Sequence, residues 1–445
     1  MPEKLLSLIL ALIILLQAWL VRKHVGTWIF PACIYGVFWF FYTFIPLIAV
    51  PTGEIEPIAV AYILTTCLFF SFSSVAFPWR AAYAYKISSN NDVHYNSAFI
   101  RYTFFTLGTL SSAGTIANWG IQGFSFHDIA FNLLNTSGEY LAKRYSGELE
   151  PNIAAQLSLT LMYPTAILGG LLYGSRNAKD SGALYLIVSL TPSILVMIVE
   201  AAKGTLFLVL ALFWAGTLLV KLNDENIKAR KNVSLMKIFI WGVPLLSAVV
   251  FSFLARGIDT DASLLSVLDK LYYYFASYSS GHLYAFSDWF SSAIGVGSKI
   301  PYGGIDDSNG FYTFMAVFNL FGTDKVAPHG VYDEYYYIEN LLQTNIYTYY
   351  RGLIHDFGIM GSVVFTSFLG FFVHLTFFWL LTSRHAPLSA SLFAHFIGFS
   401  YTSFIVSLLI WNSVYASFFL TAIVFAINDR FRCKSSLLRL IRFKT

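Results

Sequence analysis

The chain has 445 residues, of which 57% are hydrophobic and 12% are charged, and its mean hydropathy is +0.63. Soluble domains carry about 25% charged residues, so this composition excludes an ordinary soluble protein. The formal net charge of +4 is small, and no nucleic-acid partner is expected. We therefore expect an all-α polytopic membrane protein in which residues 1–445 form a single integral membrane domain.

Apolar runs recur along the chain, and each is long enough to cross roughly 30 Å of hydrocarbon as a helix. The first run, at residues 5–20, has no small-x-small cleavage site before Arg22, and another run follows at once. We therefore expect a retained helix rather than a cleaved signal. The runs predict about eleven transmembrane helices, at residues 4–21, 27–50, 58–79, 102–121, 156–173, 183–199, 204–220, 238–255, 357–381, 389–409 and 414–427.

Lysine and arginine are divided unevenly between the connectors of these helices. One set of connectors holds 19 basic and 5 acidic residues, a net charge of 19 − 5 = +14, and the other holds 9 basic and 19 acidic residues, or 9 − 19 = −10. Basic connectors face the cytoplasm, so we expect the N-terminus outside and the C-terminus inside. The basic tail at residues 428–445 is then cytoplasmic, and the loops at 122–155 and 256–356 are extracytoplasmic.

The large loop before the ninth helix, residues 256–356, is where chemistry is expected. Loops longer than about 15 residues are usually functional or disordered, and this loop is too rich in tyrosine to be disordered. Within it, Leu264–Ser280 and Val331–Gln343 are candidates for amphipathic helices that lie flat on the membrane. Its histidines and acids lack HExxH-like and EF-hand spacing, and the three cysteines lack CxxC spacing, so no metal site is expected.

Several basic residues of the extracytoplasmic side lie at predicted membrane boundaries or in the smaller loop: Lys143, Arg144, Lys203, Arg256 and Arg351. One interpretation is that their long side chains reach lipid head groups. If the helix ends meet, the same residues form a cationic pocket instead. Its natural ligand is a phosphate or diphosphate at head-group depth, which arginine can bind bidentately.

Tyrosines crowd the large loop, and about half of them fit an interfacial aromatic belt. The functional alternative is a sugar platform, because pyranose C–H faces stack on aromatic rings. Tyr347, Tyr349 and His282 are the candidate sugar-binding residues on this interpretation. Gly358 and Gly361, which open the ninth predicted helix, are spaced for close approach of another helix.

These features resemble a known family. The segment reading Asn345-Ile-Tyr-Thr…Arg351…Asp356-Phe-Gly358-x-x-Gly361, the Lys203-Gly-Thr turn between middle helices and Arg256 at the end of a later helix resemble the bacterial O-antigen, or oligosaccharide repeat-unit, polymerases. The architectural resemblance covers the whole chain, and the specific motif covers about 17 residues, 345–361. It implies a fold like that of the GT-C integral membrane glycosyltransferases.

The resemblance implies a metal-independent enzyme of the bacterial inner membrane, without a cofactor, whose active site faces the periplasm. It would transfer a growing glycan from one polyprenyl diphosphate to the non-reducing end of a repeat unit on another. The partners are these lipid-linked oligosaccharides and the bilayer, and a chain-length regulator is left open.

The resemblance also assigns expected roles to residues. Arg351 and Arg256 would bind the diphosphate, with help from Lys203, Lys143 and Arg144, because preorganised cations stabilise a departing anion. The base that takes the acceptor proton stays open among Asp356, His355, Glu200 and His282.

Two other functions stay open. The related O-antigen ligases place a histidine-containing pair eleven residues before a Gly-x-x-Gly, where this chain has Tyr347-Thr348, and this difference favours a polymerase. A transporter of lipid-linked sugars would need charged residues along several spans and short loops. The spans here are nearly free of charge, and the large loop has 356 − 256 + 1 = 101 residues.

Overall fold

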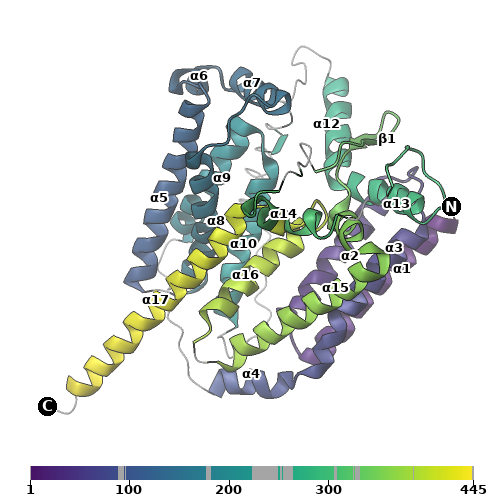
Figure 1. The fold of residues 1–445 in the computed structure, drawn as a ribbon. Helices are drawn as coiled ribbons and strands as arrows, with labels where there is room; N and C mark the ends of the chain where they lie inside the picture. Colours follow the sequence, from purple (N-terminus) through teal and green to yellow (C-terminus); the bar gives the residue numbers. More distant parts are fainter. Residues whose placement is uncertain are drawn as a thin grey trace. The chain divides into compact units, whose positions relative to one another are not determined.

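The computed structural model describes residues 2–88, 95, 97–176, 182–222, 249–250, 253, 264–304, 308–323, 325, 331–383 and 385–442. Its described part is mostly helical, with a single two-stranded hairpin (Figure 1). Eight helices there are long and apolar enough to cross a membrane. The expectation of an all-α polytopic membrane protein is confirmed at this level.

Eight of the eleven predicted spans coincide with these helices: Pro2–Val25 (α1), Pro31–Ala49 (α2), Pro57–Ala76 (α3 with η1), Ile153–Gly174 (α8), Gly182–Glu200 (α9), Lys203–Lys221 (α10), Thr348–Thr382 (α15) and Asn412–Phe431, the first part of α17 (Asn412–Arg442). The predicted span at 102–121 lies in α5 (Ala98–Ile121), whose Ser, Thr, Gly and Asn residues make it less apolar. The one at 389–409 is shorter, because α16 is Pro387–Thr402 and a turn follows. The span predicted at 238–255 lies mostly outside the described residues.

The chain divides into two compact units, and the first comprises Met1–Pro78, Val233–His374 and Phe399–Asn412. In this unit α1, α2 and α3 pack on one another, and shorter elements pack on α2 and α3. These shorter elements are α12 (Leu264–Ser279) and α13 (Gly281–Ala293). The hairpin of β1 (Tyr336–Ile338) and β2 (Leu342–Thr344) packs on α12 and α13 in turn, while α14 (Phe311–Leu320) packs on η2 (Leu408–Ile410).

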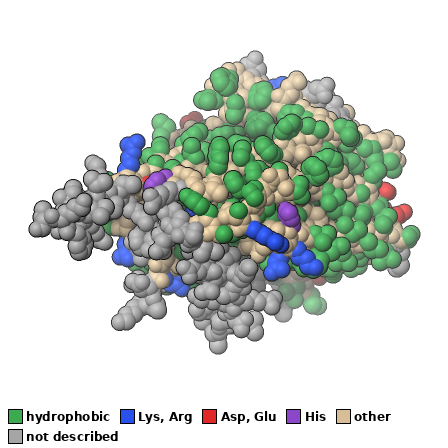
Figure 2. Space-filling view, turned by 90° about the horizontal axis from the view of Figure 1, so that it is seen from below, with side chains coloured by type: hydrophobic (Ala, Val, Ile, Leu, Met, Phe, Trp, Pro, Cys, Tyr) green, Lys and Arg blue, Asp and Glu red, His purple; other side chains and the backbone are tan. Residues whose placement is uncertain are grey.

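Helix α1 shows the pattern expected of a helix that faces lipid. Its buried residues include Ser7, Ala11 and Ala18, which are small and recur at helical spacing. Its large apolar residues point outward instead, and Leu5, for example, is 61% exposed. In a bilayer, small residues let helices approach closely while large apolar ones meet lipid. Figure 2 shows hydrophobic side chains covering most of the described surface on the face in view.

The second unit comprises Trp79–Asn232, Leu375–Gly398 and Ser413–Thr445. Helix α8 packs along α5, α9 and α10. Helices α8 and α10 approach closely at Gly170 and Gly216, where an added Cβ on either would overlap the backbone of the other helix. The unit also contains α4 (Trp79–Ser88), α6 (Phe126–Phe131) and α7 (Leu133–Ser146).

The segment before α15 agrees with only one of its two predicted helices. Leu264–Ser279 is helical, as expected. Val331–Gln343 is not a helix, because its β-prone tyrosines pair as a hairpin with Tyr336 opposite Thr344. Asn340, with φ +55°, closes the turn, as asparagine often does.

Gly358 is a break in α15 rather than a packing contact. It has φ +70° and ψ 174° between two helical stretches, Thr348–Phe357 and the longer one that follows. Only glycine readily adopts this conformation. An added Cβ would meet no atom of the described chain within 4 Å, so the expected close approach of another helix at this glycine is wrong.

We expect Gly358→Ala to lower the free energy of unfolding by about 1–3 kcal/mol, because alanine is strained at this φ and ψ. The matched control is Gly120→Ala, a helical glycine of α5 with open space around its Cα, where alanine is neutral or slightly stabilising. Thermal unfolding of the two variants in detergent measures the difference. Equal stability of the two variants would contradict the assigned strain.

Candidate functional site

Arg351 lies in the first turn of α15, and the start of this helix is fixed by the core of the first unit. The backbone N–H of Tyr349 donates to the carbonyl of Ser403 at 2.9 Å. The hydroxyl of Tyr35, from α2, contacts the hydroxyls of both Tyr349 and Tyr350, and Thr66 of α3 donates to Tyr350 at 2.6 Å. A buried hydroxyl network of this kind fixes the backbone from which Arg351 projects.

Four aromatic rings surround the guanidinium of Arg351, and we call them the aromatic cage. The guanidinium carbon lies 4.1 Å from the ring centroid of Tyr332, 4.3 Å from Tyr347, 5.3 Å from Trp289 and 5.6 Å from Tyr302. All four distances are within the range of cation–π attraction. Trp289 comes from α13 and the others from segments between α13 and α15, so this part of the chain folds around one cation.

Among the described residues, the charge of Arg351 is paired on one side only. Its Nη2 donates to both carboxylate oxygens of Glu334, at 2.9 and 3.0 Å. Its Nε and Nη1 are buried and have no hydrogen-bond partner among the described residues. Arg351 is 3% exposed and the Glu334 side chain 28% exposed, so the ion pair lies at the edge of the buried site. Nothing in the sequence distinguishes Glu334 from the other acids of the loop, so its pairing with Arg351 was not predicted.

The tyrosine hydroxyls of the cage hold its acidic residues in place. Tyr347 donates to the backbone carbonyl of Glu334 at 3.0 Å, and Tyr302 donates to the carboxylate of Asp288 at 2.9 Å. Burial raises the pKa of Tyr347 to about 12, and burial together with neighbouring phenols and acids also raises the pKa of Tyr302. Both hydroxyls therefore stay protonated donors at neutral pH.

Asp356 has a structural position next to the cage. Its carboxylate accepts from the Ser308 hydroxyl and from the backbone N–H groups of Tyr312, at 3.1 Å, and Thr313, at 2.6 Å. These last two groups belong to the first turn of α14, so Asp356 satisfies N–H groups that a helix start leaves free. The ring of the adjacent His355 is buried, 5.2 Å from Trp289 and 5.4 Å from Tyr312.

The candidate sugar-binding residues are all buried. Tyr347 belongs to the cage, and Tyr349 is 2% exposed within the hydroxyl network of α15. His282, from α13, is 1% exposed and donates from Nε2 to the carbonyl of Tyr42 at 2.9 Å. Burial lowers the pKa of His282 to about 4, against an opposing effect of the bond to Tyr42, so this ring is neutral at pH 7. Their sugar-binding roles stay predictions.

The second unit holds three of the predicted cationic residues. Lys203 is 7% exposed and begins α10, just after Ala201, whose φ is +51°. On α7, Lys143 pairs with Glu139 at 3.0 Å and lies 4.7 Å from the ring of Phe124, while Arg144 is exposed. Arg256 lies outside the described residues, so its predicted role with Arg351 stays a prediction.

Glu200, the last residue of α9, lies in a polar cluster near these cations. Its carboxylate accepts from the side-chain amide of Asn118 at 3.0 Å, and the same amide nitrogen lies 3.3 Å from the hydroxyl of Tyr140. Asn152 donates to the amide oxygen of Asn118 at 2.7 Å. Burial, followed by the negative charge of Glu200, raises the pKa of Tyr140 to about 12. The carboxylate of Glu200 thus accepts from a neutral amide that Asn152 in turn holds in place.

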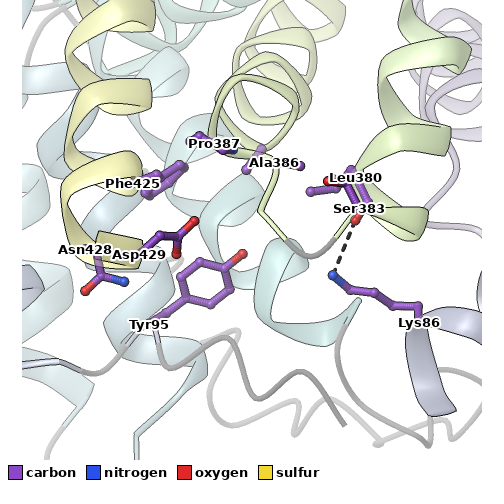
Figure 3. Close-up of a pocket in the computed structure, with 10 residues that line it drawn as sticks. Lys86, Tyr95, Leu380, Ser383, Ala386, Pro387, Phe425, Asn428 and Asp429 are labelled. Atoms are coloured by element: carbon purple, nitrogen blue, oxygen red, sulfur yellow. Dashed lines mark hydrogen bonds between the residues drawn. The ribbon is translucent and has the colours of Figure 1, made fainter. Parts of the chain in front are cut away.

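A small polar cavity of about 30 Å³ lies elsewhere in the second unit, lined by Lys86, Tyr95, Asn428 and Asp429 among others (Figure 3). Its volume suits one or two water molecules and no sugar. Lys86 donates to the carbonyl of Leu380 at 3.3 Å and so serves the C-terminal end of α15, where a cation is favourable. Burial lowers the pKa of Lys86, and the charge of Asp429 opposes this effect.

We expect Asp356→Asn to destabilise the protein by about 1–3 kcal/mol, because the amide nitrogen cannot accept from the start of α14. Asp333→Asn, which changes an exposed carboxylate of the same segment, is the matched control and should be neutral. Thermal unfolding in detergent measures both. A stable Asp356→Asn protein would contradict the capping role.

Because His282 is neutral when folded and has an ordinary pKa of about 6.5 when unfolded, the unfolded chain binds the extra proton between pH 6.5 and 4. Stability should therefore fall as pH drops through this window, by up to about 3 kcal/mol. His282→Asn, which keeps a donor toward Tyr42, should remove this part of the slope. Unfolding midpoints from pH 4 to 7, with the exposed His127→Asn as control, test it. An unchanged slope in His282→Asn would contradict the assignment.

Among the described residues, no three or more His, Cys, Asp and Glu side chains are grouped so as to hold a metal ion. Comparison with protein-family models, with curated proteins and with solved structures gave no match for this chain.

Proposed function

We propose that this chain is an integral membrane glycosyltransferase that polymerises oligosaccharide repeat units carried on polyprenyl diphosphates. It transfers the growing glycan from one diphosphate carrier to the non-reducing end of a repeat unit on another. The observation that carries the proposal is the buried guanidinium of Arg351, which is paired on one side and has its Nε and Nη1 unpaired among the described residues. The motif that contains Arg351 resembles that of the repeat-unit polymerases.

The chemistry of the transfer matches this guanidinium. Negative charge builds up on the diphosphate oxygen as its bond to the sugar breaks. A preorganised cation in a site of low dielectric stabilises this charge far more than it would in water. Arginine also offers several N–H donors in fixed directions, which suits the oxygens of a phosphate.

The surroundings of the cage suit a sugar. Tyr302 is half-buried at the rim of the cage. Tyr335, next to Glu334, is 46% exposed, and Tyr337, in strand β1 of the hairpin that follows, is 64% exposed. Exposed tyrosine rings can stack on pyranose faces, and their hydroxyls can bond to sugar hydroxyls. These three residues are more accessible candidates for glycan contact than the buried Tyr349.

The proposal places the protein in the bacterial inner membrane, with the cage at the periplasmic surface. The charge difference between connectors supports this orientation, with the N-terminus outside and the C-terminus in the cytoplasm. The diphosphate-binding roles expected of Lys203, Lys143, Arg144 and Arg256 stay predictions. The reaction so described needs no metal and no cofactor.

In cells that lack this gene, we expect surface lipid to carry single repeat units instead of a ladder. Arg351→Met fills the cage without a charge, and we expect it to lower polymerisation by about 10²–10³-fold at normal protein level. Lys299→Ala removes an exposed pairing with Glu54 and is the matched control, which should restore the ladder. Glycan length profiles with immunoblots of each variant make the measurement.

Loss of all surface glycan in the deleted cells, single units included, would contradict a polymerase and favour a ligase or a transporter. A full ladder with Arg351→Met would instead contradict the role of Arg351 in a protein that is still a polymerase.

A further inference from the structure

Three carboxylates of the described residues lie around the aromatic cage, and they differ in how many of their oxygens already accept hydrogen bonds. Asp356 accepts three hydrogen bonds at the start of α14 and is 6% exposed. Asp288 uses one oxygen for the backbone N–H of Lys299, at 2.8 Å, and the other for the hydroxyl of Tyr302. Both are committed to holding the protein in shape, and neither is hydrogen-bonded to the guanidinium.

Glu334 differs from both, because it is hydrogen-bonded to the guanidinium and is not used to hold another part of the described backbone. In the described part of the chain its carboxylate accepts hydrogen bonds from Arg351 alone. Its side chain is 28% exposed, whereas the guanidinium that it contacts is 3% exposed. Each carboxylate oxygen has about two lone-pair sites, so both oxygens keep capacity for a further donor. Glu334 therefore has spare acceptor capacity and access from outside, directly at the cation.

The backbone around Glu334 is also held in place. The hydroxyl of Tyr347 donates to its carbonyl oxygen while the ring of Tyr347 lies 4.3 Å from the guanidinium carbon. Strand β1 begins two residues later, at Tyr336, and pairs with strand β2 (Leu342–Thr344). A general base must be within hydrogen-bond reach of the proton it takes. A carboxylate on a fixed backbone that is partly exposed can be approached by an acceptor hydroxyl.

We propose that Glu334 is the general base of the transfer, taking the proton from the acceptor sugar hydroxyl. This inference rests on the proposed function, and it assigns a residue that lay outside the set of Asp356, His355, Glu200 and His282. The bond between the acceptor oxygen and the anomeric carbon of the donor forms. The bond between that carbon and the diphosphate oxygen breaks, and its electron pair leaves with the diphosphate. The hydroxyl proton goes to the carboxylate of Glu334, so no other reactant is needed.

In this arrangement a single guanidinium serves both halves of the reaction. Its Nη2 holds the carboxylate that receives the proton, and its Nε and Nη1 are left for oxygens of the leaving diphosphate. Transfer of the proton to Glu334 removes its negative charge at the moment when the leaving group gains one, so the guanidinium can then serve the diphosphate alone.

The test uses Glu334→Gln, which keeps the shape and an oxygen acceptor for Arg351 but cannot serve as the base. We expect it to lower polymerisation by about 10²–10⁴-fold at normal protein level. Asp333→Asn, the neighbouring exposed carboxylate, is the matched control and should retain full activity. Glu334→Asp keeps a carboxylate and should recover part of the rate.

A second measurement separates proton transfer from anion binding. Inorganic pyrophosphate should raise the unfolding temperature of purified wild type and of Glu334→Gln, and should leave Arg351→Met unchanged. A full glycan ladder with Glu334→Gln would overturn the inference. Loss of both the ladder and the pyrophosphate response in Glu334→Gln would also overturn it, because Glu334 would then only position Arg351. Pyrophosphate protection of Arg351→Met would count against the proposed function instead.

Discussion

The buried guanidinium of Arg351 is the constraint on which the rest of the first unit depends. Removing a cation from water costs several kcal/mol, so every element near it must supply compensation. Helix α13 supplies Trp289, the segment after it supplies Tyr302, and the segment before the hairpin supplies Tyr332 and Glu334. A segment that would otherwise have little core of its own thus acquires one, built around a charge.

The membrane constrains the same helix in a different way. Beyond Gly358, α15 is a long apolar helix with large exposed residues such as Phe368, which is 70% exposed. Before Gly358, the short stretch Thr348–Phe357 is buried except at its end. The break at Gly358 therefore separates a lipid-facing helix from a short helical stretch that belongs to the protein core. An unbroken helix could not change its direction at this point.

How far the sequence predicts this structure depends on the range of the interaction. Apolar runs are local, and eight of the eleven predicted spans coincide with helices of spanning length. The helix at Leu264–Ser279 follows from its own periodicity, whereas Val331–Gln343 has a helix-like pattern that strand pairing overrides. The pairing of Asp356 with α14, across more than 40 residues, leaves no periodic trace in the sequence. Arg351 stood out because it is a cation at a membrane boundary, but its partner Glu334 did not, since nothing local distinguishes it from other acids.

The choice of aromatic rings rather than further carboxylates around Arg351 has a consequence for binding. A ring attracts a cation through its quadrupole by about 0.5–2 kcal/mol and carries no net charge. Four rings therefore lower the cost of burying the guanidinium without neutralising it. Among the described residues, only Glu334 neutralises part of its charge. A second buried carboxylate in hydrogen-bond contact would compete directly with an anionic ligand for the Nε and Nη1 groups. A cage of rings with one accessible carboxylate leaves the positive charge available, which is the property that a site for a departing diphosphate requires.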